Sequence, residues 1–136
     1  MKISFPYETK PSSIFGAIKR PVAKVHFWSK KFNRYLEYLM IVDTGADYTL
    51  LPLSAAGELE VNLRKDCQPF RTAGVGGEEK VYLLKRAKMK IGNWGKNIPV
   101  GFLEREDIPP LLGRESCLND LDVRFLHFTT TLATLK

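Results

Sequence analysis

The chain has 136 residues, of which 44% are hydrophobic and 26% are charged, and its formal net charge is +6. This size suits one domain with a modest core, and the composition excludes a disordered, collagen-like or repeat protein. No run reaches the roughly 18 apolar residues of a membrane span, and the opening MKISFPYETKPSS lacks the apolar stretch of a signal peptide, so we expect a cytoplasmic protein with no membrane segment.

The first twenty residues carry apolar side chains, among them Phe5, Ile14 and Phe15, at no regular period. They predict an irregular N-terminal arm, residues 1–20, packed on a domain that spans residues 21–136. From residue 22 to 28 apolar and mixed positions alternate, as in a strand with one face in the core. Residues 35–42 are more continuously apolar and predict a strand deep in a sheet.

Turn residues and a two-residue period dominate the rest of the chain. Ser54 is predicted to cap a short helix that continues through residues 55–59. The glycine cluster 74–77 predicts a hairpin tip, and two alternating segments around 81–91 and 98–102 predict further strands. A second short helix is predicted from about 114 to 121, and residues 123–136 as one strand or a hairpin. The fold class is therefore all-β with one or two short helices.

The positive charge raises the question of a nucleic acid partner. Most basic residues are scattered, and the densest group is Lys85, Arg86, Lys88 and Lys90. These residues lie mostly on one face of a predicted strand whose other face is apolar. A solvated outer face that discourages pairing of strand edges explains this group, so the distribution argues against nucleic acid.

Cysteine and histidine are rare in this chain. Cys67 and Cys117 are the two cysteines, and we interpret both as reduced structural thiols rather than as a disulfide or a reactive pair. Neither they nor His26 and His127 have the spacing of metal ligands. A zinc or thiol enzyme therefore has little support, and we expect no metal site and no cofactor.

The stretch IVDTGADYTLLP, residues 41–52, places Asp43 at the end of an apolar strand. An aspartate there is costly unless it is hydrogen-bonded, paired or used in chemistry. Two explanations stay open from these residues alone. Asp43 could bond its own backbone in a turn while Gly45 supplies a special backbone dihedral angle, or the carboxylate could react.

Three segments in this order resemble the retropepsins, the aspartic proteases of retroviral type and their cellular and bacterial relatives. They are IVDTGADYTLLP, then GVGG at 74–77, then LLGRE at 111–115, and the resemblance covers about residues 21–125 in outline. It implies a closed, barrel-like fold and aspartic endopeptidase activity on peptide or protein substrates.

Hydrolysis by this family needs two carboxylates, one ionised to take a proton from water and one protonated to donate to the carbonyl oxygen. Two adjacent carboxylates share a proton because they cannot both ionise readily, a pattern for which aspartic proteases are the standard example. This chain has one Asp-Thr-Gly, at Asp43, Thr44 and Gly45. The resemblance therefore implies a homodimer in which each copy contributes Asp43.

The resemblance also assigns roles around this motif. The Thr44 hydroxyl is expected to bond across the pair to the partner loop, and the Gly45 backbone to approach the substrate. Asp47 is similar to the acidic residue that binds the substrate backbone and pairs with the arginine after the late glycine, here Arg114 following Gly113. That pair would hold the loop from behind.

The glycine hairpin is similar to the flap that closes over bound peptide in this family. A plain β-turn is the alternative. The flap tip would consist of Gly74, Val75, Gly76 and Gly77. Candidate pocket residues are Ala46, Tyr48, Val75, Pro110 and Leu111, and Tyr48 is bulkier than the residue usual in the family.

An inactive dimeric module of the same fold, binding peptide or nucleic acid, stays open as a second function. The C-terminal segment 123–136 is longer than the single terminal strand of the retroviral enzymes. That length leaves open a dimer interface built differently from theirs.

Overall fold

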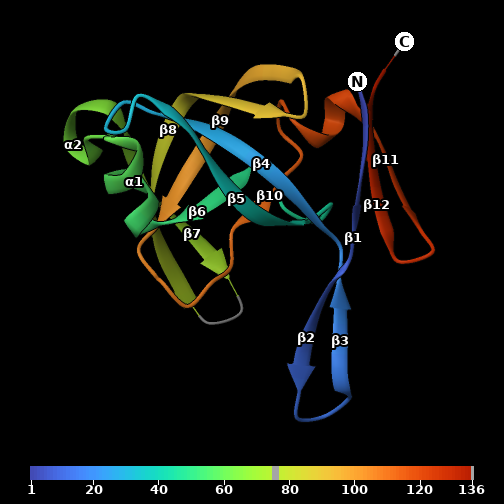
Figure 1. Ribbon diagram of the computed structural model, residues 1–136. Helices are drawn as coiled ribbons and strands as arrows, with labels where there is room; N and C mark the ends of the chain where they lie inside the picture. Colours follow the sequence, from blue (N-terminus) through green and yellow to red (C-terminus); the bar gives the residue numbers. More distant parts are fainter. Residues whose placement is uncertain (75–76, 136) are drawn as a thin grey trace.

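The computed structural model of the chain describes residues 1–74 and 77–135, which form a mostly β molecule (Figure 1). None of the described helices is long and apolar enough to span a membrane. The strands are β1 (Lys2–Pro6), β2 (Glu8–Ser12), β3 (Gly16–Arg20), β4 (Val22–Ser29), β5 (Arg34–Val42), β6 (Thr49–Pro52), β7 (Gln68–Gly74), β8 (Gly77–Ile91), β9 (Trp94–Leu103), β10 (Leu111–Leu112), β11 (Leu121–Leu126) and β12 (Thr129–Thr134). The helices are α1 (Leu53–Leu59), α2 (Leu63–Asp66) and the short 3-10 helix η1 (Leu118–Asp120).

The main sheet curls into a closed ring. Its seven strands follow the order β4-β5-β10-β6-β9-β8-β7, and β4 also pairs with β8, so that β7 is attached outside the ring. This arrangement confirms the expected closed, barrel-like all-β fold. The two-residue strand β10 runs parallel to β5 and antiparallel to β6, and it thereby separates the two strands that flank the loop at residues 43–48.

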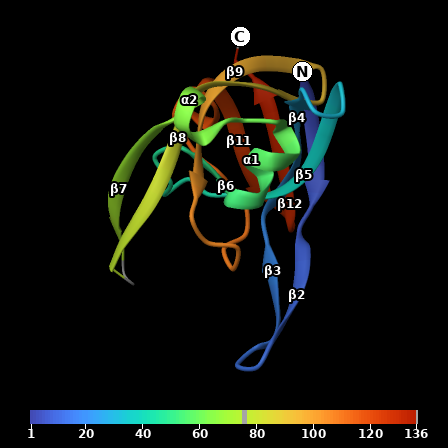
Figure 2. The ribbon, with the colours of Figure 1, turned by 90° about the vertical axis from the view of Figure 1, so that its left-hand side faces the viewer.

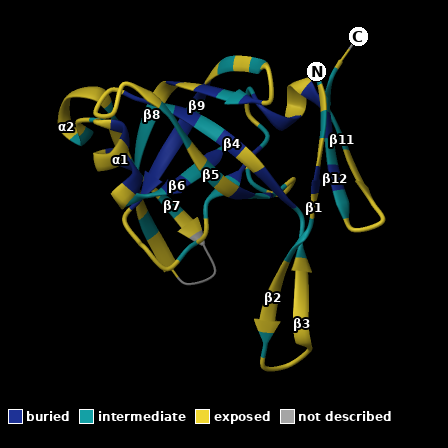
Figure 3. Ribbon diagram, viewed as in Figure 1, coloured by how far each residue is buried: buried dark blue, intermediate teal, exposed yellow. Residues whose placement is uncertain are grey.

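The core lies inside this ring. Strand β4 alternates as predicted, with Ala23, Val25 and Phe27 fully buried, and β8 contributes Met89 and Ile91 from the neighbouring wall (Figure 3). The strands predicted in 22–28, 81–91 and 98–102 are confirmed. The first two bury mainly one face, and β8 shifts register between Leu84 and Ala87. In 98–102 Gly101 is buried as well as the apolar face.

Strand β5 is present as predicted, but it is buried only at its end. Met40 and Val42 are buried, whereas Leu39 is exposed. The reason lies in the neighbours: β10 covers only the last residues of β5, so the earlier part of the strand has β4 beside it and no second neighbour among the described strands. The continuous apolar run therefore does not indicate burial along its whole length.

A second sheet, in the order β1-β12-β11, stands at one side of the molecule (Figure 1). The predicted hairpin in 123–136 is confirmed as β11 and β12 within the described residues. One face of this sheet carries Phe5, Leu132 and Leu121, which are buried in the core, and the opposite face is mainly polar apart from Leu126. The sheet is thus a layer that covers the barrel.

The irregular arm predicted for residues 1–20 is wrong in its local structure. β1 pairs with β12, and β2 and β3 form a hairpin that projects from the body (Figures 1 and 2). At its tip Ile14 and Phe15 are 81% and 74% exposed. The pairing of β1 could not be seen locally because its partner lies at the other end of the chain. The division into an arm and a domain at residue 20 stays a prediction.

The helices differ in detail from the predictions. α1 is present, but Ser54 is not its cap: the N-cap is Pro52, and Ser54 bonds the carboxylate of Glu106 through its N–H and its hydroxyl. α2 was missed, although Asn62 caps it by accepting from two backbone N–H groups. That asparagine before a short polar segment was the available signal.

The helix predicted for residues 114–121 is wrong. That segment consists of turns and the three-residue η1. Ser116 has a φ of 56°, in the left-handed region, which ends any α-helix at that point. The inward positions were nevertheless correct, since Cys117, Leu118 and Leu121 are all buried.

Replacing Leu132 by Ala tests how the second sheet is held. Leu132 is fully buried between β1 and β11, so its truncation should lower the free energy of unfolding by about 2–5 kcal/mol. Ile14→Ala removes comparable apolar volume from the exposed hairpin tip, and it should change the free energy of unfolding by less than about 0.5 kcal/mol. Urea unfolding at one protein concentration measures both, and equal losses would contradict this packing.

Candidate active site

The loop after β5 is a tight turn around Asp43. The Asp43 backbone N–H donates to the Leu112 carbonyl at 3.0 Å, and the Ala46 N–H donates to the Asp43 carbonyl at 3.1 Å. The Gly45 N–H donates to Asp43 Oδ1 at 2.9 Å. No described residue donates a hydrogen bond to Oδ2. The carboxylate is therefore fixed through one oxygen, and its second oxygen is available.

This turn needs glycine at position 45 because there is little room for a side chain, and not because the backbone has an unusual dihedral angle. The φ of Gly45 is not in the left-handed region, so the special angle considered from the sequence is absent. A Cβ built on Gly45 would lie 3.3 Å from Asp43 Oδ1, closer than most such contacts. Glycine thus permits the close approach of its backbone to the carboxylate.

Strand β10 holds the base of the loop. The Ile41 N–H donates to the Pro110 carbonyl at 2.9 Å, and the Gly113 N–H donates to the buried hydroxyl of Thr49 at 3.1 Å. Gly113 passes so close to the loop that a Cβ on it would lie 2.3 Å from the carbonyl carbon of Tyr48. Only glycine fits there, which explains the glycine of LLGRE in physical terms. Leu111, predicted to line a pocket, is half-buried between β5 and β6.

Arg114 bonds the same loop through its side chain and its backbone. Its guanidinium forms an ion pair with Asp47 and donates to the Thr44 carbonyl at 3.1 Å. The Arg114 N–H also donates to the Ala46 carbonyl at 3.0 Å. The pair expected between Arg114 and Asp47 is therefore present. Both side chains are exposed, so the ion pair alone contributes little to the stability of the loop. The hydrogen bonds from Arg114 to the Thr44 and Ala46 carbonyls contribute more.

Tyr48 connects this loop to the glycine hairpin. Its ring packs edge-on against Phe70 of β7, with ring centroids 5.8 Å apart. A Cβ on Gly101 would lie 2.9 Å from the Tyr48 ring, so the ring occupies the space over that glycine. Burial, and then the charge of Asp47, raise the pKa of the Tyr48 phenol. Phe70 was not predicted, although a glycine inside the apolar strand β9 signals such a close approach.

The predicted glycine hairpin is present as β7 and β8, with Gly74 opposite Gly77. Gly77 has a φ of 110°, which disfavours any other residue there. Val75 and Gly76 lie outside the described residues. The hairpin projects beyond the barrel on the same side as the β2–β3 hairpin, as both ribbon views show (Figures 1 and 2).

Arg105 connects β8, two residues beyond Gly77, to the segment that leads into β10. Its guanidinium bonds Glu79 of β8 at 2.8 Å and Asp107 at 2.5 and 2.9 Å. These bonds raise the pKa of Arg105, and the bond from Arg105 lowers the pKa of the Asp107 carboxyl. Arg105 could not be identified from the sequence, because a lone arginine in a charged loop has no local signature.

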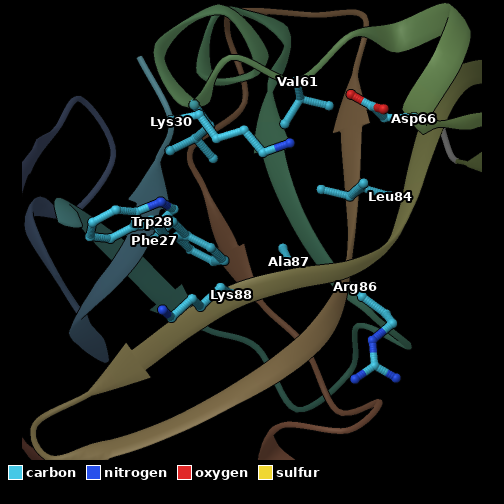
Figure 4. A pocket seen from close by; sticks show the side chains of 10 residues that line it. Phe27, Trp28, Lys30, Val61, Asp66, Leu84, Arg86, Ala87 and Lys88 are labelled. Carbon is cyan, nitrogen blue, oxygen red and sulfur yellow. The ribbon is translucent and has the colours of Figure 1, made fainter. Parts of the chain in front are cut away.

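A pocket of about 410 Å³ opens elsewhere on the barrel, and none of the candidate site residues lines it (Figure 4). Trp28, Lys88 and Asp66 lie around it. The Asp66 carboxylate accepts a bond from the Asn62 N–H at 2.8 Å, so it serves the cap of α2. Within residues 1–74 and 77–135, no group of three or more acidic, histidine or cysteine side chains could hold a metal ion.

Replacing Gly113 by Ala should disrupt the loop. The added methyl group meets backbone rather than a movable side chain, so the free energy of unfolding should fall by about 3 kcal/mol or more. Gly57→Ala is the matched control. Gly57 lies inside α1 with no atom near the added methyl group, and the substitution should raise stability by up to about 1 kcal/mol. Thermal or urea unfolding that ranks the two variants the other way would contradict this geometry.

Cys117 lies in the buried turn after Arg114, and its burial leads to a prediction about pH dependence and alkylation. Both cysteines are free, as predicted, and burial raises the pKa of the Cys117 thiol to about 12. Because an unfolded thiol ionises near pH 8.5, the free energy of unfolding should fall as the pH rises from about 8.5 towards 12. At pH 8 native protein should be alkylated at the half-buried Cys67 well before Cys117. Equal rates, read by mass spectrometry, would show that the turn is open.

Comparisons with known proteins agree with this geometry. A family model described as aspartyl protease matches residues 31–116, which is more than half of the chain. A search among curated proteins finds no match. A crystal structure of a retropepsin-like aspartic protease from Rickettsia conorii has the same fold, with a TM-score of 0.66 and 21% sequence identity over 97% of this chain and 98% of that one. The chain therefore belongs to the aspartyl protease family and has the retropepsin-like fold.

Proposed function

We propose that the chain is an aspartic endopeptidase whose site is completed by a second copy of itself. The supporting observation is Asp43, which is held at the end of β5 with one carboxylate oxygen free. One Asp-Thr-Gly is encoded in the chain, and acid and base catalysis on a water molecule needs two carboxyl groups. Two copies related by a two-fold axis would supply them.

In the proposed reaction, the two Asp43 carboxyl groups share one proton. The ionised Asp43 takes a proton from water as the water oxygen attacks the scissile carbonyl carbon, while the protonated Asp43 of the other copy donates its proton to the carbonyl oxygen. A tetrahedral diol results. The carboxyl that took the water proton then gives it to the amide nitrogen, the C–N bond breaks, and the diol returns its proton to the other carboxylate. No metal ion and no covalent intermediate take part.

The surrounding residues take supporting roles in this proposal. The Thr44 hydroxyl bonds no described residue of its own chain, so it is free to bond the partner loop. Arg114 and Asp47 hold the loop and leave Asp47 exposed to the substrate backbone. The hairpin closes over the peptide and excludes water. The flap residues are Gly74, Val75, Gly76 and Gly77, and the pocket residues are Ala46, Tyr48, Val75, Pro110 and Leu111.

The basic row on β8 does not require a nucleic acid partner. Lys88 lies 5.1 Å from the centroid of the Trp28 ring, and Lys90 lies 4.5 Å from that of Tyr35. Cation–π contacts of this kind contribute to the packing of β4, β5 and β8 on one another. This placement accounts for these two lysines within the chain itself.

The direct test is Asp43→Asn. Cleavage of a mixed peptide library at acid to near-neutral pH should fall at least about 100-fold, because the amide cannot exchange the proton. Asp66→Asn is the matched control, since its amide oxygen still accepts the Asn62 N–H, and it should cleave like the wild type. Full cleavage by Asp43→Asn would disprove the mechanism. A wild type that cleaves nothing at any pH but retains RNA or DNA in a salt-dependent way would favour the inactive module.

A further inference from the structure

The pocket of about 410 Å³ lies where the wall of the barrel opens. Strand β8 pairs with β7 as far as Leu83 and with β4 only at Met89 and Lys90. Residues 84–88 pair with neither of these strands, and β8 shifts its register against β9 in the same stretch. The lining residues from β8 all belong to this stretch: Leu84, Arg86, Ala87 and Lys88. The pocket therefore follows from the strand pairing and not from loose packing of side chains.

Hydrogen bonds fix the opposite wall, which α1 provides. The buried Ser29 hydroxyl, at the end of β4, donates to the Glu58 carbonyl at 2.6 Å. The Lys30 N–H donates to the Leu59 carbonyl at 3.4 Å. The last turn of α1 is thus attached to β4, which builds the pocket into the fold. Small-molecule sites are usually preformed in this way, and the volume lies in their range of about 300–1,000 Å³.

The interior of the pocket is apolar (Figure 4). The apolar lining side chains, all buried or half-buried, are Phe27, Trp28, Leu59, Val61, Leu84 and Ala87. They come from β4, from α1 and the loop after it, and from β8. An apolar group that entered the pocket would be removed from water on several sides, which favours its binding.

The charged side chains at the pocket are mostly cationic. Lys30, Arg86 and Lys88 line it, against the single carboxylate of Asp66. Within the part of the chain that the structure describes, none of these three cations forms an ion pair. The Asp66 carboxylate already accepts the Asn62 N–H at 2.8 Å. The net positive charge of the lining therefore favours an anionic ligand.

Lys30 is the cation best placed to meet such a ligand. Its side chain reaches across the pocket towards Leu84, whereas Arg86 extends away from the pocket (Figure 4). The Lys88 amine lies 5.1 Å from the centroid of the Trp28 ring and is engaged there. A ligand in the pocket would thus find one free ammonium group above an apolar floor.

We propose that this pocket binds a small carboxylate with an apolar body, of which a medium-chain fatty acid anion is the simplest example. The carboxylate pairs with Lys30, and the chain lies against Phe27, Leu59 and Ala87. None of the candidate active-site residues lines the pocket. The inference therefore goes beyond the proposed peptidase function and does not rest on it.

Octanoate and octan-1-ol test this inference, because they share one chain and only octanoate is charged. Octanoate should bind with a Kd of about 1 mM or below, at least about threefold more tightly than octan-1-ol. Amide NMR spectra recorded during the two titrations measure both affinities. The largest shifts should fall on the segments that line the pocket, residues 27–30, 59–61 and 84–88.

A charge reversal tests the role of Lys30. Lys30→Glu should weaken octanoate binding at least about tenfold and change octan-1-ol binding by less than about twofold, because only the carboxylate meets the reversed charge. Lys31→Glu is the matched control. Lys31 is the next residue of the same turn, but it does not line the pocket. This control changes the net charge equally and should bind octanoate within about twofold of the wild type.

Filling the pocket tests where the apolar chain lies. Val61 lies in the loop between α1 and α2 and lines the pocket (Figure 4). Val61→Trp places a large ring there and should abolish the binding of both probes. The amide spectrum of the free variant shows whether it is folded, and the Lys30 comparison stands without it.

Three results would overturn this inference. Octanoate may bind no more tightly than octan-1-ol, its shifts may fall outside the pocket segments, or Lys30→Glu and Lys31→Glu may weaken it equally. Equal weakening would indicate general attraction to a basic surface. The same titration of Asp43→Asn should give the wild-type affinity, because Asp43 does not line the pocket. A failure of this site and a failure of the proposed peptidase are therefore separate outcomes.

Discussion

The two-residue strand β10 is the constraint on which the candidate site depends. It lies between β5 and β6, where it accepts the N–H of Asp43 at Leu112, and the residue that follows it, Gly113, donates its N–H to the buried Thr49 hydroxyl. Backbone N–H groups at the buried end of β5 need such fixed partners, because an unsatisfied polar group there costs free energy. The β10 strand supplies them from a distant part of the chain and so fixes the loop before any substrate arrives.

Three contacts connect the loop and β10 to the neighbouring parts of the fold. Tyr48 packs on Phe70 of the glycine hairpin, and Arg105 bonds Glu79 on the other strand of that hairpin. Arg114 continues into the buried turn that leads to β11. The loop, the hairpin and β11 are therefore parts of one connected framework. In the proposed enzyme, this framework relates the position of the carboxylate to the flap above it.

The sequence predicted the elements whose signal is local. Alternation identified β4, β8 and β9, and the letters of IVDTGADYTLLP and LLGRE led to Asp43 and to the contact of Asp47 with Arg114. The irregular arm was wrong because β1 gains its structure from β12, at the opposite end of the chain. The prediction of the late helix was wrong because Ser116 adopts a left-handed backbone, which no residue type in this segment signals. Phe70 and Arg105 escaped notice because their partners are brought close only by the fold.

The proposed mechanism requires two identical chains to share one catalytic site. Calorimetric titration with a statine-containing peptide, which mimics the tetrahedral diol, measures how many inhibitor molecules bind per chain. We expect one inhibitor to bind per two chains, and we expect Asp43→Asn to abolish this tight binding. Tight binding of one inhibitor to each chain, in a protein that stays monomeric during the titration, would contradict it.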